Sequence, residues 1–157
     1  MANYGVPDDL ADALPWSWAR ERLVASRNYW VVTASAGGRP HAMPVWGVWL
    51  PGEVFWFSCD NGSRKARNVR ANPQVVVAAD STVEVVSVEG RARAATADEI
   101  TAAVAAFVEK YGHETGDADL DEFLRANATF TVEPERAFGI IERPDEFSSR
   151  ATRWRWG

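Results

Sequence analysis

The sequence is poor in residues that form cross-links or hold metals. One cysteine, Cys59, occurs in 157 residues, so no disulfide can form within the chain, and a single thiol is compatible with a reducing cytoplasm. The two histidines, His41 and His113, lie far apart, and no Cys/His spacing is typical of a zinc or haem site. We therefore expect a cytoplasmic protein without a metal site.

Motifs for catalysis by side chains alone are also missing. The sequence has neither a Gly-x-Ser-x-Gly elbow nor a Cys/His pair at a recognised spacing, and it has no Walker loop or Gly-x-Gly-x-x-Gly fingerprint. No catalytic residue can be named from these patterns. If the protein is an enzyme, we expect a cofactor to supply the reactivity.

Long apolar runs and an excess of positive charge are lacking too. No stretch approaches 18 consecutive apolar residues, and Asp8, Asp9 and Asp12 precede the first apolar pattern, so we expect no membrane span and no secretory signal. The formal net charge of -5 argues against general binding of nucleic acid. Any anion that the protein recognises should therefore be small and bound locally.

The composition is that of one folded domain spanning residues 1–157, with 46% hydrophobic and 25% charged residues and a polar stretch, 1–13, that we expect to be flexible. Tryptophan is abundant. We expect many of its side chains to line a core, a subunit interface or a pocket for a flat ligand. The eight tryptophans are Trp16, Trp18, Trp30, Trp46, Trp49, Trp56, Trp154 and Trp156.

Apolar periodicity and turn residues predict a mainly β (α+β) fold, a β-barrel-like domain of six or seven mostly antiparallel strands with a few helices. The expected strands are 29–35, 41–50, 53–59, 74–79, 84–94, 128–133 and 137–142. The expected helices are 14–26, with Trp16, Ala19, Leu23 and Val24 on its apolar face, 63–72, 96–111 after a capping box, and 120–126 after a polar loop at 112–119.

The run 41–50 is apolar on both alternating faces. A strand covered on both sides belongs in a barrel wall with a second subunit or a flat cofactor packed outside it. Pro44 cannot donate to a ladder, so it should mark an edge or a bulge. Gly90, inside the strand 84–94, predicts a bend.

The stretch 61–73 concentrates positive charge in an acidic protein. Arg64, Lys65, Arg67 and Arg70 fall within seven residues, and the stretch has no acidic residue. Cations in the first turns of a helix are repelled by the helix dipole by roughly 0.3–1 kcal/mol each. One interpretation is a surface helix with solvated basic side chains, and the other is a site for an anion.

The turn before this helix favours the anion site. Gly62 supplies a tight turn, Ser63 is a good helix N-cap, and Pro73 ends the helix. Free backbone N–H groups, the Ser63 hydroxyl, and the Arg64 and Lys65 side chains could then converge on a phosphate. The hypothesis is a phosphate site at the start of this helix.

The same residues resemble a known signature. Phe55 to Cys59, followed by Asn61-Gly62-Ser63-Arg64-Lys65-Ala66 and then Asn72-Pro73, are similar to the motif of the pyridoxamine 5'-phosphate oxidase-like split-barrel flavoproteins. Residues 39–49 and 152–156 resemble more specifically the branch of actinobacterial F420-dependent reductases. The resemblance runs from about residue 14 to the C-terminus.

The resemblance implies a split β-barrel that forms a homodimer, with cofactor sites at the dimer interface. It implies that Ser63, Arg64 and Lys65 bind the cofactor phosphate, and that the backbone of 43–46 runs along the isoalloxazine or deazaflavin ring. Ser58 and Cys59 would lie beside the phosphate chain, and Asn68 would assist in binding either the phosphate or the lactyl-glutamyl tail. The implied cofactor-binding set is Met43, Pro44, Val45, Trp46, Ser58, Cys59, Asn61, Ser63, Arg64, Lys65 and Asn68.

Two departures from the true pyridoxamine phosphate oxidases argue against oxidation of vitamin B6: Glu84-Val85 stands where those enzymes have Arg-Gln, and the chain ends in Trp-Arg-Trp. The expected function is an F420-dependent oxidoreductase that passes a hydride to an electron-poor, hydrophobic small molecule in a Trp-rich pocket. An FMN-dependent oxidoreductase of the same fold and a non-catalytic F420 carrier are the alternatives.

Overall fold

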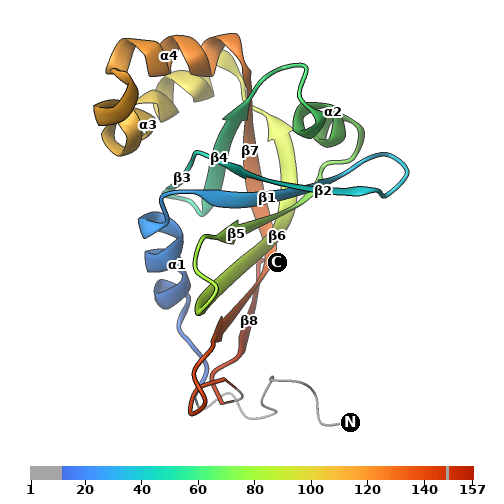
Figure 1. Ribbon diagram of the computed structural model, residues 1–157, viewed down its shortest axis with the longest axis vertical. Coiled ribbons are helices and arrows are strands. Elements are labelled where there is room, and N and C mark those ends of the chain that lie inside the picture. Colours follow the sequence, from blue (N-terminus) through green and yellow to red (C-terminus); the bar gives the residue numbers. More distant parts are fainter. Residues whose placement is uncertain (1–11, 148) are drawn as a thin grey trace.

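The structure is a computed structural model that describes residues 12–147 and 149–157 (Figure 1). All but the last two residues of the polar stretch 1–13 lie outside this description. The helices are α1 (Trp16–Ala25), α2 (Arg64–Ala71), α3 (Ala97–Thr115) and α4 (Asp117–Ala126). The strands are β1 (Tyr29–Ala34), β2 (Pro40–Val45), β3 (Gly47–Leu50), β4 (Val54–Cys59), β5 (Gln74–Ala79), β6 (Glu84–Ala94), β7 (Ala128–Ile141) and β8 (Thr152–Arg155).

The strands form one antiparallel sheet whose order requires it to curl. Its path runs β2-β1-β5-β6-β7-β4-β3, and β8 pairs with β7 beside this path. The two end strands, β2 and β3, are separated in sequence by Trp46 alone. The sheet must therefore bend until its ends meet, which confirms the predicted α+β split barrel.

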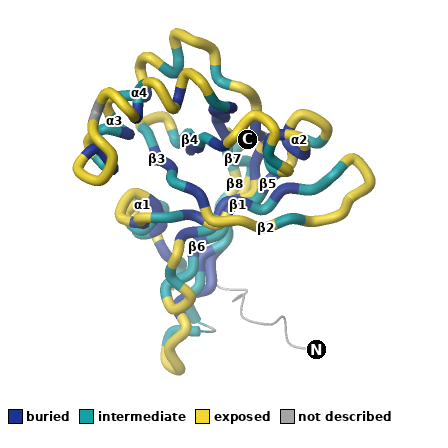
Figure 2. Tube along the Cα trace, turned by 45° about the horizontal axis from the view of Figure 1, so that its top comes forward, coloured by how far each residue is buried: buried dark blue, intermediate teal, exposed yellow. Residues whose placement is uncertain are grey.

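The predicted strand 41–50 is wrong as a single element. Its first part pairs with β1, where Val45 lies opposite Tyr29, and its second part pairs with β4, where Gly47 lies opposite Phe57. The chain changes neighbours at Trp46. β3 is largely buried on both faces, as expected for the run, but β2 is mostly exposed (Figure 2). Pro44 does lie on an edge, because β2 ends the path.

The two strands expected at 128–133 and 137–142 are one continuous strand, β7. The register of its pairing with β6 shifts between Glu89 and Gly90. Glu89 lies opposite Arg136 and Gly90 opposite Pro134, so Glu135 of β7 is the extra residue. A Cβ atom on Gly90 would lie 2.3 Å from the Glu133 carbonyl oxygen. The register shift therefore lies beside Gly90, where the sequence predicts a bend, and it lets β7 continue through Pro134.

The helical region 97–126 has almost no loop. The capping box between Thr96 and Glu99 is present as predicted. α3 continues to Thr115, and Gly116 alone, with φ of 89°, turns the chain into α4. The polar residues at 112–119 were expected to form a loop, but a glycine in the left-handed region needs no further residues to end a helix.

The main core fills the concave side of the sheet, where α1 contributes buried Ala19 and Leu23. Val24, expected on the same apolar face, is 45% exposed. The Trp16 ring contacts three other tryptophan rings, with centroids 4.7–6.3 Å away: Trp49, Trp154 and Trp156. Many of the tryptophan side chains therefore pack in or against the core, which was one of the three places expected for them. In the described part of the chain no helix is long and apolar enough to cross a membrane.

Candidate functional site

The connection from β4 to α2 is fixed by hydrogen bonds within the turn. The Ser63 hydroxyl accepts a hydrogen bond from the Ala66 N–H at 3.1 Å, which confirms Ser63 as the N-cap. The Ser63 N–H donates to the Asp60 carbonyl at 3.0 Å, and the Gly62 N–H donates to the Asp60 carboxylate at 2.8 Å. This turn orients the first residues of α2.

The four basic residues of this helix divide into two pairs. Arg67 donates to the Gly62 carbonyl, and Arg70 donates to the Asn61 carbonyl at 2.9 Å. Arg64 and Lys65 form no hydrogen bond or ion pair with any described residue. The first pair thus stabilises the turn, whereas the second pair is available to a ligand.

Both the oxygen and the nitrogen of the Asn61 side-chain amide form hydrogen bonds. Its amide oxygen accepts from Arg70 at 3.1 Å, and its amide nitrogen donates to the Ala126 carbonyl at 2.9 Å. Asn61 therefore connects α2 to the end of α4. Its predicted contact with a cofactor remains a prediction.

A hollow of about 250 Å³ lies between α2 and the hairpin that joins β1 to β2. These segments are close together in space (Figure 1), although about 25 residues separate them in sequence. The lining residues are Ser35, Arg39, Pro40, Arg64, Arg67 and Asn68. Three of the six are arginines, so the hollow favours an anion, and none of them is a tryptophan.

His41 lies close enough to Arg64 and Lys65 for their charges to affect its imidazole. Its Nδ1 atom is buried and has no hydrogen-bond partner among the described residues. Desolvation and the nearby charges of Arg64 and Lys65 lower the pKa of His41. An anion between these three side chains would offset the charges of Arg64 and Lys65 and would favour the protonated form of His41. The sequence alone did not assign His41 to the site, because nothing local connects a strand histidine to a helix 23 residues later.

Asn68 is 6% exposed and connects α2 to the sheet. Its amide nitrogen donates to the Thr33 hydroxyl on β1 at 3.0 Å. This bond holds the helix against the strand that precedes the hairpin. The structure therefore gives Asn68 a positioning role, and its predicted contact with a phosphate remains a prediction.

Ser58 and Cys59 lie at the end of β4, beneath the helix. The Ser58 hydroxyl donates to the Ala128 carbonyl at 3.3 Å, so it holds β4 against β7. Cys59 is buried, and its sulfur accepts a hydrogen bond from the Ser63 hydroxyl at 3.4 Å. Of the two side chains, Cys59 therefore contacts the turn that carries Ser63.

The residues predicted to follow the cofactor ring lie on β2 and just after it. Met43 is 44% exposed, Pro44 is exposed, and Val45 is in the core. Trp46 stacks on Tyr111 with ring centroids 4.6 Å apart and an angle of 3°. Val45 and Trp46 are used in packing. Met43 and Pro44 point to opposite faces of β2, so a ring placed along β2 would contact the backbone and one of these two side chains.

The arrangement is equipped to bind an anion and poorly equipped for chemistry of its own. The described residues contain no group of three or more His, Cys, Asp or Glu that could hold a metal ion. The imidazole of His41, whose pKa is lowered beside Arg64 and Lys65, is the candidate for proton transfer there. The residues fit a phosphate-bearing cofactor.

The comparisons with known proteins agree with this fold. The family model described as pyridoxamine 5'-phosphate oxidase matches residues 18–140. A solved structure named F420 Reductase is 22% identical, with a TM-score of 0.60 over 75% of this chain and 94% of that chain. HutZ, a haem storage protein from Vibrio cholerae, is 21% identical, with a TM-score of 0.60 over 76% and 87% of the two chains.

A conserved hypothetical protein from Mycobacterium tuberculosis is 21% identical, with a TM-score of 0.69 over 87% of this chain and 91% of that chain. At these identities the likeness shows the fold alone. No protein with a curated function matches the chain by sequence.

Proposed function

The chain belongs to the pyridoxamine 5'-phosphate oxidase family. We propose that it binds the deazaflavin cofactor F420 and serves as an F420-dependent oxidoreductase. The phosphate would lie at the start of α2. The substrate would be a small, electron-poor, hydrophobic organic molecule. FMN in place of F420, and a carrier that binds F420 without turnover, are the competing proposals.

One observation carries the proposal: Arg64 and Lys65 begin α2 with no acidic partner among the described residues, in a protein with a net charge of -5. Two such cations at a helix N-terminus repel the helix dipole and one another. The neighbouring His41 Nδ1 is buried without a partner. A phosphate would remove both costs, because it accepts hydrogen bonds from all of these groups.

When bound, F420 would supply hydride-transfer chemistry, which no side chain of this site offers. The protein's part would be to bind and orient. Arg64 and Lys65 would hold the phosphate, and the exposed edge of β2 would align the ring. His41 would sit beside the phosphate and respond to its charge.

We also propose that a second copy of the chain covers the outer face of the sheet. Alternation along β1 puts Trp30 and Val32 on the face opposite the core, next to paired residues of β2 and β5. Trp30 is 48% exposed, and Val32 and the partners of both residues on β2 and β5 are not buried either. We define the outer face by Trp30, Val32, Ala42, Pro44, Val76 and Ala78.

The test is equilibrium binding of F420 and of FMN, followed by quenching of tryptophan fluorescence. The double variant Arg64→Ala with Lys65→Ala should bind F420 at least about 100-fold more weakly, since each charge-assisted hydrogen bond contributes roughly 1.5–3 kcal/mol. The matched control removes two exposed cations elsewhere, Arg20→Ala with Arg125→Ala, and should keep its affinity.

Unchanged affinity in the first double variant would refute the phosphate site. Tighter binding of FMN than of F420 by the unmodified protein would favour the FMN-dependent alternative. Tight binding of reduced F420 with no oxidation by nitroaromatic, quinone or enone acceptors would favour the carrier.

A further inference from the structure

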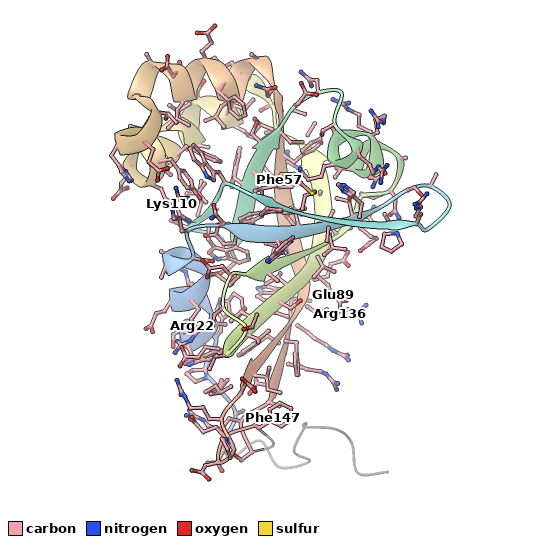
Figure 3. All side chains as sticks on the ribbon, viewed as in Figure 1. Arg22, Phe57, Glu89, Lys110, Arg136 and Phe147 are labelled. Atoms are coloured by element: carbon pink, nitrogen blue, oxygen red, sulfur yellow. The ribbon has the colours of Figure 1, made fainter. Side chains whose placement is uncertain are left out.

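A second hollow lies at α1, β3 and α3, and Lys110 is one of the residues that line it. Its volume is about 320 Å³. Lys110 comes from α3 and lies between that helix and α1, on the side of the sheet away from Glu89 and Arg136 (Figure 3). The lining residues are Val24, Val48, Trp49, Leu50, Ala106, Glu109 and Lys110. Apart from the last two, all of them are apolar.

The hydrogen-bond acceptors around Lys110 match the number of N–H groups of a neutral amine. Its Nζ atom donates to the Tyr29 hydroxyl at 2.7 Å and to the Gly47 carbonyl at 3.0 Å. A neutral amine has two N–H groups and one lone pair, so these two acceptors use both hydrogens and leave the lone pair. An ammonium would have a third N–H, and no further acceptor for it occurs within the described ranges.

Burial outweighs the charges around Lys110, which partly oppose one another. Lys110 forms no ion pair with any described carboxylate. Desolvation, helped by the positive charge of Arg27 and opposed by Asp80, lowers the pKa of Lys110 to about 8. The aromatic rings of Tyr29 and Tyr111 lie 4.5 and 5.4 Å from Nζ and attract an ammonium, which limits the decrease. Glu109 also lines the hollow.

We propose that this hollow is a binding site for small apolar aldehydes, and that Lys110 captures them as an imine. The amine lone pair attacks the carbonyl carbon and forms a C–N bond. The carbonyl oxygen leaves as water, taking up the two protons of the amine, and a C=N bond replaces the C=O bond. The reaction needs no oxidant or reductant, and it does not depend on the α2 site.

An amine in an apolar pocket is the usual setting of lysines that form Schiff bases. The apolar walls would select the aldehyde, because burial of an alkyl chain against them contributes about 0.8 kcal/mol for each methylene. A protonated imine retains one N–H group. That group can return to Tyr29 or Gly47, so the captured state keeps part of the original hydrogen bonding.

The sequence supplies an internal reference for the test, since lysine occurs only at positions 65 and 110. The unmodified protein is incubated with hexanal and cyanoborohydride, and alkylation is followed at each lysine by peptide mass spectrometry. We expect Lys110 to react at least about tenfold faster than Lys65 with hexanal. The Lys110 rate should rise with pH to a plateau, with a midpoint near pH 8.

Two comparisons separate a binding site from a merely reactive amine. The preference for Lys110 should be strong with hexanal and weak with glycolaldehyde, which has no alkyl chain. Ala106→Leu should fill the hollow and slow the reaction of Lys110 with hexanal, whereas Ala105→Leu, at an exposed position of the same helix, should not.

The proposal is overturned if hexanal modifies Lys65 as fast as Lys110. It is also overturned if the reaction at Lys110 is equally fast with both aldehydes. The second criterion needs only the unmodified protein, so the test stands even if Ala106→Leu fails to fold.

Discussion

At the scale of single residues, the candidate site depends on which charged groups lack a partner. Arg67 and Arg70 donate hydrogen bonds to carbonyl oxygens of the turn before α2. Arg64 and Lys65 have no hydrogen-bond or ion-pair partner in the described chain. The energetic cost of that arrangement in the free protein is a reason to expect a ligand. The pKa of His41 should change when such a ligand binds, because it responds to nearby charges.

The pH dependence of His41 follows from its surroundings. Its pKa is lowered in the folded protein, so between the folded and unfolded values the unfolded chain binds more protons, and stability falls as pH drops below about 6.5. A bound dianion should reverse this shift. With saturating sulfate, which keeps its charge in this range, we expect the pKa of His41 to rise by about one pH unit.

Nuclear magnetic resonance titration of the two imidazole rings would check this. His113, near the end of α3, is the internal control for effects of ionic strength. If both rings responded equally to sulfate, the anion would not lie beside His41, and the site at α2 would lose its support.

At the scale of elements, the junction between β2 and β3 is the point where the barrel closes. Gly47 begins β3, its N–H and carbonyl both bond to the Tyr111 hydroxyl, and its carbonyl also accepts from Lys110. A Cβ atom there would lie 2.4 Å from Phe55 and 2.6 Å from the Trp56 carbonyl oxygen. The contact with backbone cannot relax by a change of rotamer.

We therefore expect Gly47→Ala to lower the free energy of unfolding by about 2–3 kcal/mol, the usual cost of overpacking a core. Urea denaturation would measure it. Gly37→Ala is the control, because a Cβ atom there would meet only the Ser35 hydroxyl, at 3.9 Å. A change below about 0.5 kcal/mol in both variants would contradict this account of the junction.

At the scale of the whole molecule, one face of the sheet lies on the main core, and the opposite face is covered unevenly. α3 and α4 pack against Val48 and Trp56 of β3 and β4, whereas none of the outer-face residues on β1, β2 and β5 is buried. Tyr29, Val31 and Thr33 of β1 are buried, whereas Trp30 between them is 48% exposed. Alternating strands normally put polar side chains on a solvated face. The apolar outer face is the reason to propose a homodimer.

Trp30→Glu should dissociate that dimer, since a buried carboxylate at the centre of an interface is costly and aromatic residues contribute most to such contacts. Light scattering after size-exclusion chromatography should give half the mass of the unmodified protein. Phe123→Glu on α4, where Phe123 is 46% exposed, is the matched control and should stay dimeric.

The result can be read in three ways. A monomeric unmodified protein would refute the second copy, and so would a dimer that withstands Trp30→Glu. Dissociation by both variants would place the interface over a different or larger surface than the outer face.

Local signals in the sequence determined most elements and the start of the candidate site. The capping box at Thr96 and the N-cap at Ser63 each depend on neighbours a few residues away, and the structure has both. The same holds for the α+β class, because alternation and turn residues act locally. The basic stretch was likewise visible as a charge pattern.

Tertiary structure decided which strands pair and which distant side chains come into contact. The split of 41–50 at Trp46 results from the closure of the barrel, which gives β2 and β3 different partners. The division of four cations into two bonded and two available ones depends on where the carbonyls of the turn point. His41 joins Arg64 and Lys65, and Lys110 reaches Gly47, only after folding, because these contacts connect residues far apart in the chain.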